Sequence, residues 1–151
     1  MKLQLNSNAF GAEALKGIGS LQGLKVLDIR NNQLGDGCMP HLAQIKSLAE
    51  LSISKNGITD EGISAIRGLG QLSYLDLTTN AISDEGVTHL VAFRRLTHLY
   101  LMSNRVTQKR VPELYEALDR LEVLDLRFNI SDAGIKEHLK ASRPAKLQLF
   151  C

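Results

Sequence analysis

This 151-residue sequence has no tryptophan, three prolines and two cysteines, and aromatic residues make up only 5% of it. The two cysteines, Cys38 and Cys151, are far apart, so the dense disulfide framework of small secreted domains is not expected. The N-terminus has no basic segment followed by an apolar one, and no apolar run approaches the roughly 20 residues of a membrane-spanning helix. These absences favour a soluble protein of a reducing cytoplasm. A bacterial protein delivered into a host cytosol would have the same features.

The sequence also lacks a large excess of either acidic or basic residues. The formal net charge is +2 at pH 7, so neither a nucleic acid nor a membrane surface is the expected partner. Basic residues do occur on the segments expected to be helical, but acidic residues are interleaved with them, which favours a solvated outer surface over a nucleic-acid-binding stripe. The basic residues are Lys46, Arg67, Arg94, Arg95, Arg110 and Arg120.

The sequence contains an internal repeat. Residues 48–71 and the directly following residues 72–95 carry the same pattern of leucine, aliphatic residues, asparagine and Asp-Glu-Gly, which gives a period of 24. Extending this register gives six units and the strand of a seventh. One leucine position recurs as Leu3, Leu27, Leu51, Leu75, Leu99, Leu124 and Leu147, and one asparagine position as Asn8, Asn32, Asn56, Asn80, Asn104 and Asn129.

The repeated pattern resembles the leucine-rich repeat family. The family consensus L-x-x-L-x-L-x-x-N-x-L is present as LKVLDIRNNQL, LAELSISKNGI, LSYLDLTTNAI and LTHLYLMSNRV. The continuation I-[TS]-D-E-G is similar to the ribonuclease-inhibitor-like branch, especially its 24-residue GALA-type repeats of bacterial effector proteins. The resemblance implies an α/β solenoid, shaped as a horseshoe arc, with a parallel β-sheet on the concave face and helices on the convex face.

Period-two alternation within each Leu-x-x-Leu-x-Leu segment independently predicts a short strand with one buried face. We expect residues 1–151 to form a single domain of about six repeats plus a final strand. The asparagines should form an internal ladder, because their amides can bond backbone groups left open by the turn. No clear capping element precedes the first repeat or follows the last, so the sequence is expected either to begin inside a longer array or to present open ends to a partner.

A helix should follow each turn. Residues 11–21 predict the first one, Thr59 and Ser83 are residue types typical of helix N-caps, and Pro40 and Pro112 suit the first turn of a helix. The apolar stripe of the helices has i, i+3, i+6 spacing. Small residues precede the stripe and should let backbones pack closely; they are Ala14, Cys38, Gly62, Gly86 and Gly134. Arg110 breaks this rule in a unit one residue longer than the others, so its helix should be displaced.

Signals for chemistry are weak. Cys38-x-x-His41 has metal-like spacing, but there is no second pair, and Cys38 occupies the small-residue packing position. Asp28, Asp76 and Asp125 share one register position and could form a carboxylate row that binds a cation or acts as acid and base, although polar residues are expected there in any such repeat. We therefore expect no enzyme activity, no cofactor and no metal site.

The outward positions of the strands predict the binding surface, because the concave face of a solenoid is broad and accessible. The first half of this face is polar, whereas apolar and aromatic side chains gather in the second half. Such residues suggest a partner surface, unless they only fill the tight inner curve of the sheet. The predicted partner-binding residues are Tyr74, Asp76, His98, Tyr100, Met102, Asp125, Arg127 and Phe128.

The expected function is non-catalytic binding of another protein through the concave face. The resemblance implies an inhibitor or adaptor as the sharper form of this hypothesis. It also leaves open a substrate-recognition segment of a ubiquitin-ligase-type bacterial effector. A third interpretation is a structural repeat protein that forms homo-oligomers through uncapped ends.

Overall fold

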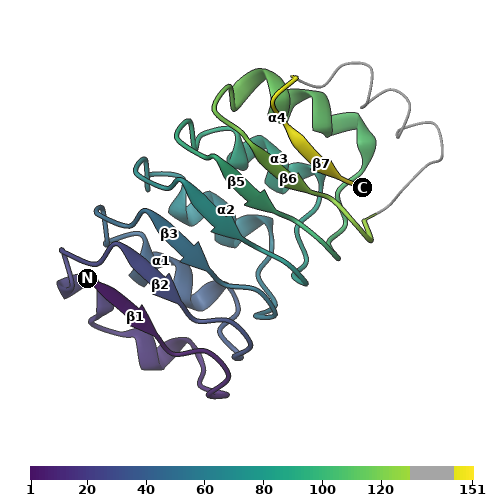
Figure 1. Cartoon of the computed structure of the whole chain (residues 1–151). Coiled ribbons are helices and arrows are strands. Elements are labelled where there is room, and N and C mark those ends of the chain that lie inside the picture. Colours follow the sequence, from purple (N-terminus) through teal and green to yellow (C-terminus); the bar gives the residue numbers. More distant parts are fainter. Residues whose placement is uncertain (130–144) are drawn as a thin grey trace.

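The computed structural model describes residues 1–129 and 145–151 (Figure 1). Within these residues, seven strands form one parallel sheet in the order of the chain, as the repeat predicts. The strands are β1 (Lys2–Gln4), β2 (Val26–Asp28), β3 (Glu50–Ser52), β4 (Tyr74–Asp76), β5 (His98–Tyr100), β6 (Val123–Asp125) and β7 (Gln148–Phe150).

Residues that occupy the same position in successive repeats pair with each other in the sheet. Leu27, Leu51, Leu75 and Leu99 are direct partners on successive strands, and each is at most 1% exposed. A strand with one buried face cannot slip by one residue without moving this leucine row into water. The leucine spacing therefore fixes which side chains lie on the free face of the sheet.

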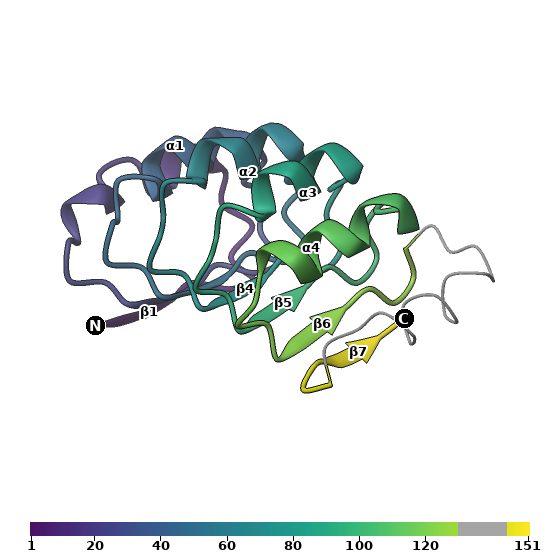
Figure 2. The ribbon, with the colours of Figure 1, turned by 90° about the horizontal axis from the view of Figure 1, so that it is seen from above.

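Helices cover the other face (Figure 2). The predicted apolar stripe is buried throughout: Ile63, Ile66 and Leu69 follow this pattern in the third unit, each at 0% exposure. The α-helices are α1 (Met39–Leu42), α2 (Asp60–Ile66), α3 (Asp84–Leu90) and α4 (Val111–Ala117), and short 3-10 helices span Ala12–Leu15, Ile18–Ser20, Asp36–Cys38 and Gln108–Arg110. The result is an α/β arc with the sheet on its inner, concave face.

Helix α4 is out of line with α1, α2 and α3 (Figure 2), in agreement with the displacement predicted from Arg110. Leu114 is 24 residues after Leu90, but Leu118 is 25 residues after Phe93, so the extra residue lies between Leu114 and Leu118. All four of these side chains remain at most 2% exposed. The longer unit thus keeps its core contacts while its helix moves.

The helix predicted over residues 11–21 is wrong. Two separate 3-10 turns, Ala12–Leu15 and Ile18–Ser20, occupy this segment. Gly17 lies between them with a φ of 86°, a left-handed conformation that ends a helix. Glycine also occupies position 19, and its low helix propensity weakens any longer helix here.

The asparagine ladder is confirmed. The Asn56 amide nitrogen donates to the carbonyls of Ile53 in its own repeat, at 3.1 Å, and of Ile29 in the preceding repeat, at 3.0 Å. Asn104 makes the corresponding bonds to Leu101 and Leu77, at 3.0 and 2.9 Å. These bonds satisfy carbonyls at the strand ends and tie each repeat to its neighbour.

A second ladder connects the turns before the helices. The carboxylates of Asp36, Asp60 and Asp84 accept hydrogen bonds from both the backbone N–H and the hydroxyl of Thr59, Ser83 and Thr107, respectively. Thr59 occupies the N-cap position of α2, as its residue type predicts, but its side chain makes no capping hydrogen bond. Ser83 does cap α3, by accepting from the N–H of Glu85 at 3.2 Å.

The same aspartates explain why glycine precedes two of the helix stripes. A Cβ added to Gly62 would lie 2.3 Å from an oxygen of Asp36, and one added to Gly86 would lie 2.3 Å from an oxygen of Asp60. The small-residue rule thus reflects a side chain of the neighbouring repeat rather than the close approach of two backbones. Gly134, which the sequence placed in this series, lies outside the described residues.

Candidate functional site

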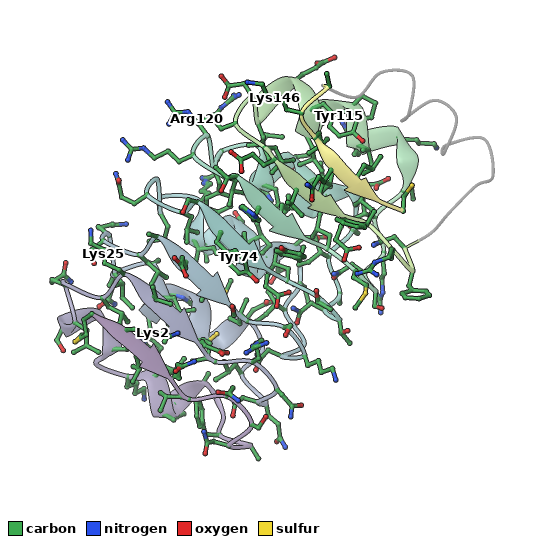
Figure 3. The ribbon with its side chains drawn as sticks, in the orientation of Figure 1. Lys2, Lys25, Tyr74, Tyr115, Arg120 and Lys146 are labelled. Carbon is green, nitrogen blue, oxygen red and sulfur yellow. The ribbon has the colours of Figure 1, made fainter. Side chains whose placement is uncertain are left out.

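The concave face of the sheet presents alternate side chains of the strands. Tyr74 lies at the middle of the array on this face, with Lys2 toward the β1 end and Lys146 toward the β7 end (Figure 3). Most predicted site residues are half-buried; these are Tyr74, Asp76, His98, Tyr100 and Met102. Arg127 and Phe128 are exposed.

Three rings on neighbouring strands form what we call the tyrosine cluster: Tyr74, His98 and Tyr100. The ring of Tyr74 is stacked on His98, with centroids 6.0 Å apart, and is tilted against Tyr100, with centroids 5.4 Å apart. The register explains the first contact, because Tyr74 and His98 are direct partners in β4 and β5. Aromatic pairs at these distances are favourable and hold each other in place.

Burial is the main factor that raises the pKa of the Tyr74 hydroxyl, and the nearby Asp76 and Tyr100 raise it further. The hydroxyl is therefore neutral at physiological pH, and it interacts with the side chain of Ser52 on the neighbouring strand. His98 is oriented by a 2.9 Å contact between its Nδ1 and the Thr97 hydroxyl. The cluster is thus an ordered amphipathic surface of the kind enriched at protein interfaces.

The three aspartates predicted to form a row lie on this face, but they differ in their side-chain partners. Asp28 and Asp125 are 6% and 3% exposed, and each carboxylate accepts hydrogen bonds from both Nε and Nη2 of the arginine two residues later. The Arg30 bonds are 2.9 and 2.7 Å long, and they are the main cause that lowers the pKa of Asp28. Two of the three carboxylates are therefore neutralised within their own strand ends and are not free to act as acid, base or cation ligand.

Asp76 differs from the other two aspartates. Position 78 carries threonine, and the Thr78 N–H donates to the carboxylate at 3.0 Å, as the N–H of Arg30 and Arg127 does in the other repeats. Among the described residues, no cationic side chain forms an ion pair with Asp76. Sequence reasoning noticed the three aspartates but missed the Asp-x-Arg spacing that distinguishes Asp28 and Asp125 from Asp76.

A second group lies around β6 and β7. The Arg127 guanidinium carbon is 5.5 Å from the centroid of the Phe150 ring, while the guanidinium also pairs with Asp125. The next residue, Phe128, is 78% exposed and has a φ of 57°. A left-handed conformation is costly for a bulky residue, so an exposed phenylalanine at this position is unusual on stability grounds alone.

The structure therefore brings the Tyr74 ring into contact with both His98 and Tyr100, and it joins Arg127 to Asp125. Phe128 lies on the turn that follows β6. Phe150 is not among the residues predicted to bind a partner. Its ring contact with Arg127 depends on the pairing of β6 with β7.

Other sequence candidates have structural roles. Cys38 is fully buried, its thiol bonds to the Gly35 carbonyl at 3.3 Å, and burial raises its pKa to about 12. Among residues 1–129 and 145–151, no group of three His, Cys, Asp or Glu side chains has the arrangement of a metal site. Two basic residues stabilise the stack of repeats, since Arg94 donates to the Ala117 carbonyl and Arg95 to the Gln71 side chain.

In the part of the chain that the structure describes, the helices are too short and too polar to cross a membrane.

Comparisons with known proteins identify the repeat. A leucine-rich repeat family model matches residues 46–106 and a second one matches residues 23–45, so together they cover more than half of the chain. A comparison with curated proteins found no match.

Two solved structures with the same fold come from bacteria. An internalin (inlF) from Listeria monocytogenes is 28% identical over 88% of this chain, with a TM-score of 0.72, and the leucine-rich repeat protein LIC12759 from Leptospira interrogans is 27% identical over 100% of it, with a TM-score of 0.70. The matches cover 36% and 37% of those two proteins, so this chain spans little more than a third of their length.

Leucine-rich repeats are typically non-catalytic modules that bind other proteins. The family models, the seven-stranded parallel sheet and the asparagine ladder agree on one assignment. The chain belongs to the leucine-rich repeat family.

Proposed function

We propose that this chain binds another protein through the concave face and performs no catalysis of its own. The observation that carries the proposal is the tyrosine cluster, Tyr74, His98 and Tyr100, on the free side of the sheet. Tyrosine is among the residues that most often dominate binding energies at interfaces. Two of the three tyrosines of the sequence lie here, although aromatic residues are scarce.

The residues after β5 and β6 extend this surface. Met102 supplies an adaptable apolar side chain, and Arg127 and Phe128 supply a cation and an exposed ring. Asp76 and Asp125 are the acidic members of the proposed contact set. The whole set lies on three adjacent strands and the segments that follow them, so one partner could contact all of it.

The alternative role, in which large side chains merely fill the inner curve, accounts less well for Phe128. Its ring is 78% exposed, so it fills no space in the sheet, whereas the same turn position of other repeats carries polar residues such as Lys55, Thr79 and Ser103. We therefore favour the binding role for the set as a whole.

Binding could inhibit the partner or recruit it. The Asp-Glu-Gly continuation of the repeats supports the finer assignment to the ribonuclease-inhibitor-like branch, with GALA-type repeats, which is part of this proposal. An inhibitor would suppress an activity of the captured protein at equimolar ratio. An adaptor would leave that activity unchanged and bring in a further protein.

The test is affinity capture with the wild type and a Tyr74→Ala/Tyr100→Ala/Phe128→Ala variant. The matched control is Glu61→Ala/Arg67→Ala/Glu85→Ala, which changes three exposed residues on and beside the helices. Circular dichroism and urea unfolding would verify that all three proteins are folded. We expect a partner that the wild type and the helix control retain and the concave-face variant loses. Equal retention by all three proteins would overturn the proposal.

A further inference from the structure

Three aspartates occupy the same position of their repeats, at the ends of β2, β4 and β6. Two residues after Asp28 and Asp125 the chain has an arginine that binds the carboxylate through its guanidinium. Two residues after Asp76 it has Thr78. Within residues 1–129 and 145–151, the central aspartate of the concave face is therefore not paired with a cation as the other two are.

The C-terminal aspartate shows what the complete arrangement contains. Asp125 on β6 is the direct partner of Phe150 on β7, and the Arg127 guanidinium pairs with the carboxylate while lying 5.5 Å from the ring centroid. A guanidinium satisfies both neighbours at once, because it donates to a carboxylate in its plane and is attracted to an aromatic face. The chain thus contains an occupied carboxylate–aromatic site for one guanidinium.

The same pair of residue types recurs at the centre of the sheet in the same register. Asp76 on β4 is the direct partner of Tyr100 on β5, as Asp125 is of Phe150. Tyr74 adds a second ring, 5.4 Å from that of Tyr100. The central site therefore has the carboxylate and more aromatic surface than the C-terminal one, but not the arginine.

The charges around this site favour a cation. Glu50 is the register neighbour of Tyr74 on β3, and neither Glu50 nor Asp76 forms an ion pair with any described residue. Arg30 on the β2 side is close enough to interact electrostatically with Asp76, but its guanidinium is already held by Asp28. A positive group from outside would meet the Asp76 carboxylate beside the rings of Tyr74 and Tyr100, with Glu50 as a further acidic residue on the neighbouring strand.

We propose that Asp76, Tyr100 and Tyr74 form a receptor for an arginine side chain of the partner protein. The guanidinium takes the place that Arg127 occupies between Asp125 and Phe150. Arginine fits better than lysine because its planar group can stack on a ring while binding a carboxylate with two donors. This inference rests on the proposed function and specifies the chemistry that the partner must present to the concave face.

The test uses an acetyl-Gly-Arg-Gly-amide peptide as the probe and two-dimensional NMR of the whole chain as the readout. We expect saturable shifts of the Tyr74, Asp76 and Tyr100 resonances. A peptide with citrulline in place of arginine has the same shape without the charge, and it should bind about tenfold more weakly, since it loses the ion pair and the cation–π contact. Equal affinity for the two peptides, or shifts located elsewhere, would overturn the inference.

Two variants test the site itself. Thr78→Arg places an arginine where the other two repeats have one, so the chain should fill its own site and bind the arginine peptide about tenfold more weakly. Asp76→Asn removes the carboxylate charge with little change in shape and should weaken binding to a similar extent. Ala65→Arg adds the same charge to an exposed position of α2 and should bind like the wild type. Unchanged affinity in both Thr78→Arg and Asp76→Asn would overturn the inference.

The failure of this inference can be distinguished from the failure of the proposed function. If the triple alanine variant loses the captured partner while Thr78→Arg and Asp76→Asn retain it, the concave face binds a protein but arginine recognition at Asp76 is wrong. If the triple alanine variant retains the partner, the proposed function itself is wrong.

Discussion

The carboxylate of Asp60 accepts two hydrogen bonds from Ser83, one from the backbone N–H at 2.8 Å and one from the hydroxyl at 2.5 Å. The two residues belong to successive repeats, so these bonds connect the start of α2 to the turn before α3. A solenoid is stabilised by such contacts between nearest neighbours, because each repeat touches little else.

Asp60→Ala should therefore reduce the free energy of unfolding by about 1–3 kcal/mol, since it leaves a partly buried N–H and hydroxyl without their acceptor. Urea unfolding followed by circular dichroism measures this change. Glu61→Ala is the control: its side chain is exposed, and the loss of one charge near a helix N-terminus should cost less than about 1 kcal/mol. Equal losses in the two variants would contradict a special role for Asp60.

Gly86→Ala should also destabilise the protein. The new Cβ would lie 2.3 Å from an Asp60 oxygen and 2.7 Å from Cγ2 of Ile82, so the overlap should outweigh the gain in helix propensity and cost about 1–3 kcal/mol. Gly70→Ala is the control, because nothing lies within 4 Å of its Cβ position, and it should be neutral or slightly stabilising.

A double-mutant cycle tests whether Asp60 causes the glycine requirement. In Asp60→Ala/Gly86→Ala the closest overlap is gone, so the combined loss should be smaller than the sum of the two single losses. The second repeat already has a larger residue at the glycine position and no aspartate at the matching position of the preceding repeat. Cys38 occupies the glycine position, and Ala12 occupies the aspartate position 26 residues earlier. Leu34 takes the place of the β-branched isoleucine. Strictly additive losses would show that the two positions are independent.

Period and spacing were sufficient to predict the sheet, its register and the buried helix stripe, because each depends on a pattern within one repeat. Helix formation over residues 11–21 was predicted incorrectly because Gly17 adopts a left-handed conformation that the apolar pattern does not reveal. The role of Gly62 was misread for another reason. Its neighbour Asp36 lies in the preceding repeat, 26 positions away, so the contact becomes visible only when repeats are compared with each other.

The candidate site was predicted in a similar way. Alternation along the strands placed Tyr74, His98 and Tyr100 on one face, and their ring contacts follow from the register. The neutralisation of Asp28 by Arg30 was missed because alternation gives the direction of a side chain but not its partner. The Asp-x-Arg spacing was a usable signal, since residues two apart on a strand end lie on the same face.

Arg30→Gln should shift acid unfolding to higher pH. The Arg30 hydrogen bonds hold the pKa of Asp28 below its ordinary value of 3.8, so the stability from this pair is present above that value and is lost as the pH falls through the lower, folded pKa. Without the guanidinium, burial should raise the pKa of Asp28, which carbon-detected NMR of the carboxyl group measures directly. Arg67→Gln, at an exposed position on the helix side, should leave the titration unchanged.

Cys38 should resist alkylation in the native protein, because burial raises its thiol pKa to about 12 and restricts access of the reagent. In a Cys151→Ser variant, iodoacetamide at mildly alkaline pH should leave the folded chain unmodified and label it once after unfolding in urea. The folded pKa exceeds the ordinary value of 9.0, so stability from the protonated thiol is complete below pH 9.0 and declines as the pH rises toward about 12. Rapid labelling of the folded variant would contradict this account.

Phe128→Gly should separate stability from binding. Phe128 has a φ of 57°, where a side chain costs about 1–2 kcal/mol and glycine costs little, and its ring is 78% exposed. The glycine variant should therefore be as stable as the wild type or more stable by up to about 1 kcal/mol in urea unfolding, because the relieved strain is partly offset by the greater entropy of the unfolded chain.

The matched control is Thr79→Gly, which replaces a residue of the same register position and a φ of 56°. It should have the same effect on stability, but it should leave capture of the partner unchanged, whereas Phe128→Gly should weaken it. This contrast is informative because both variants relieve the same backbone strain and only one removes a ring from the proposed surface. If Phe128→Gly gains stability and loses no binding, Phe128 does not belong to the contact set and its strained conformation has another cause.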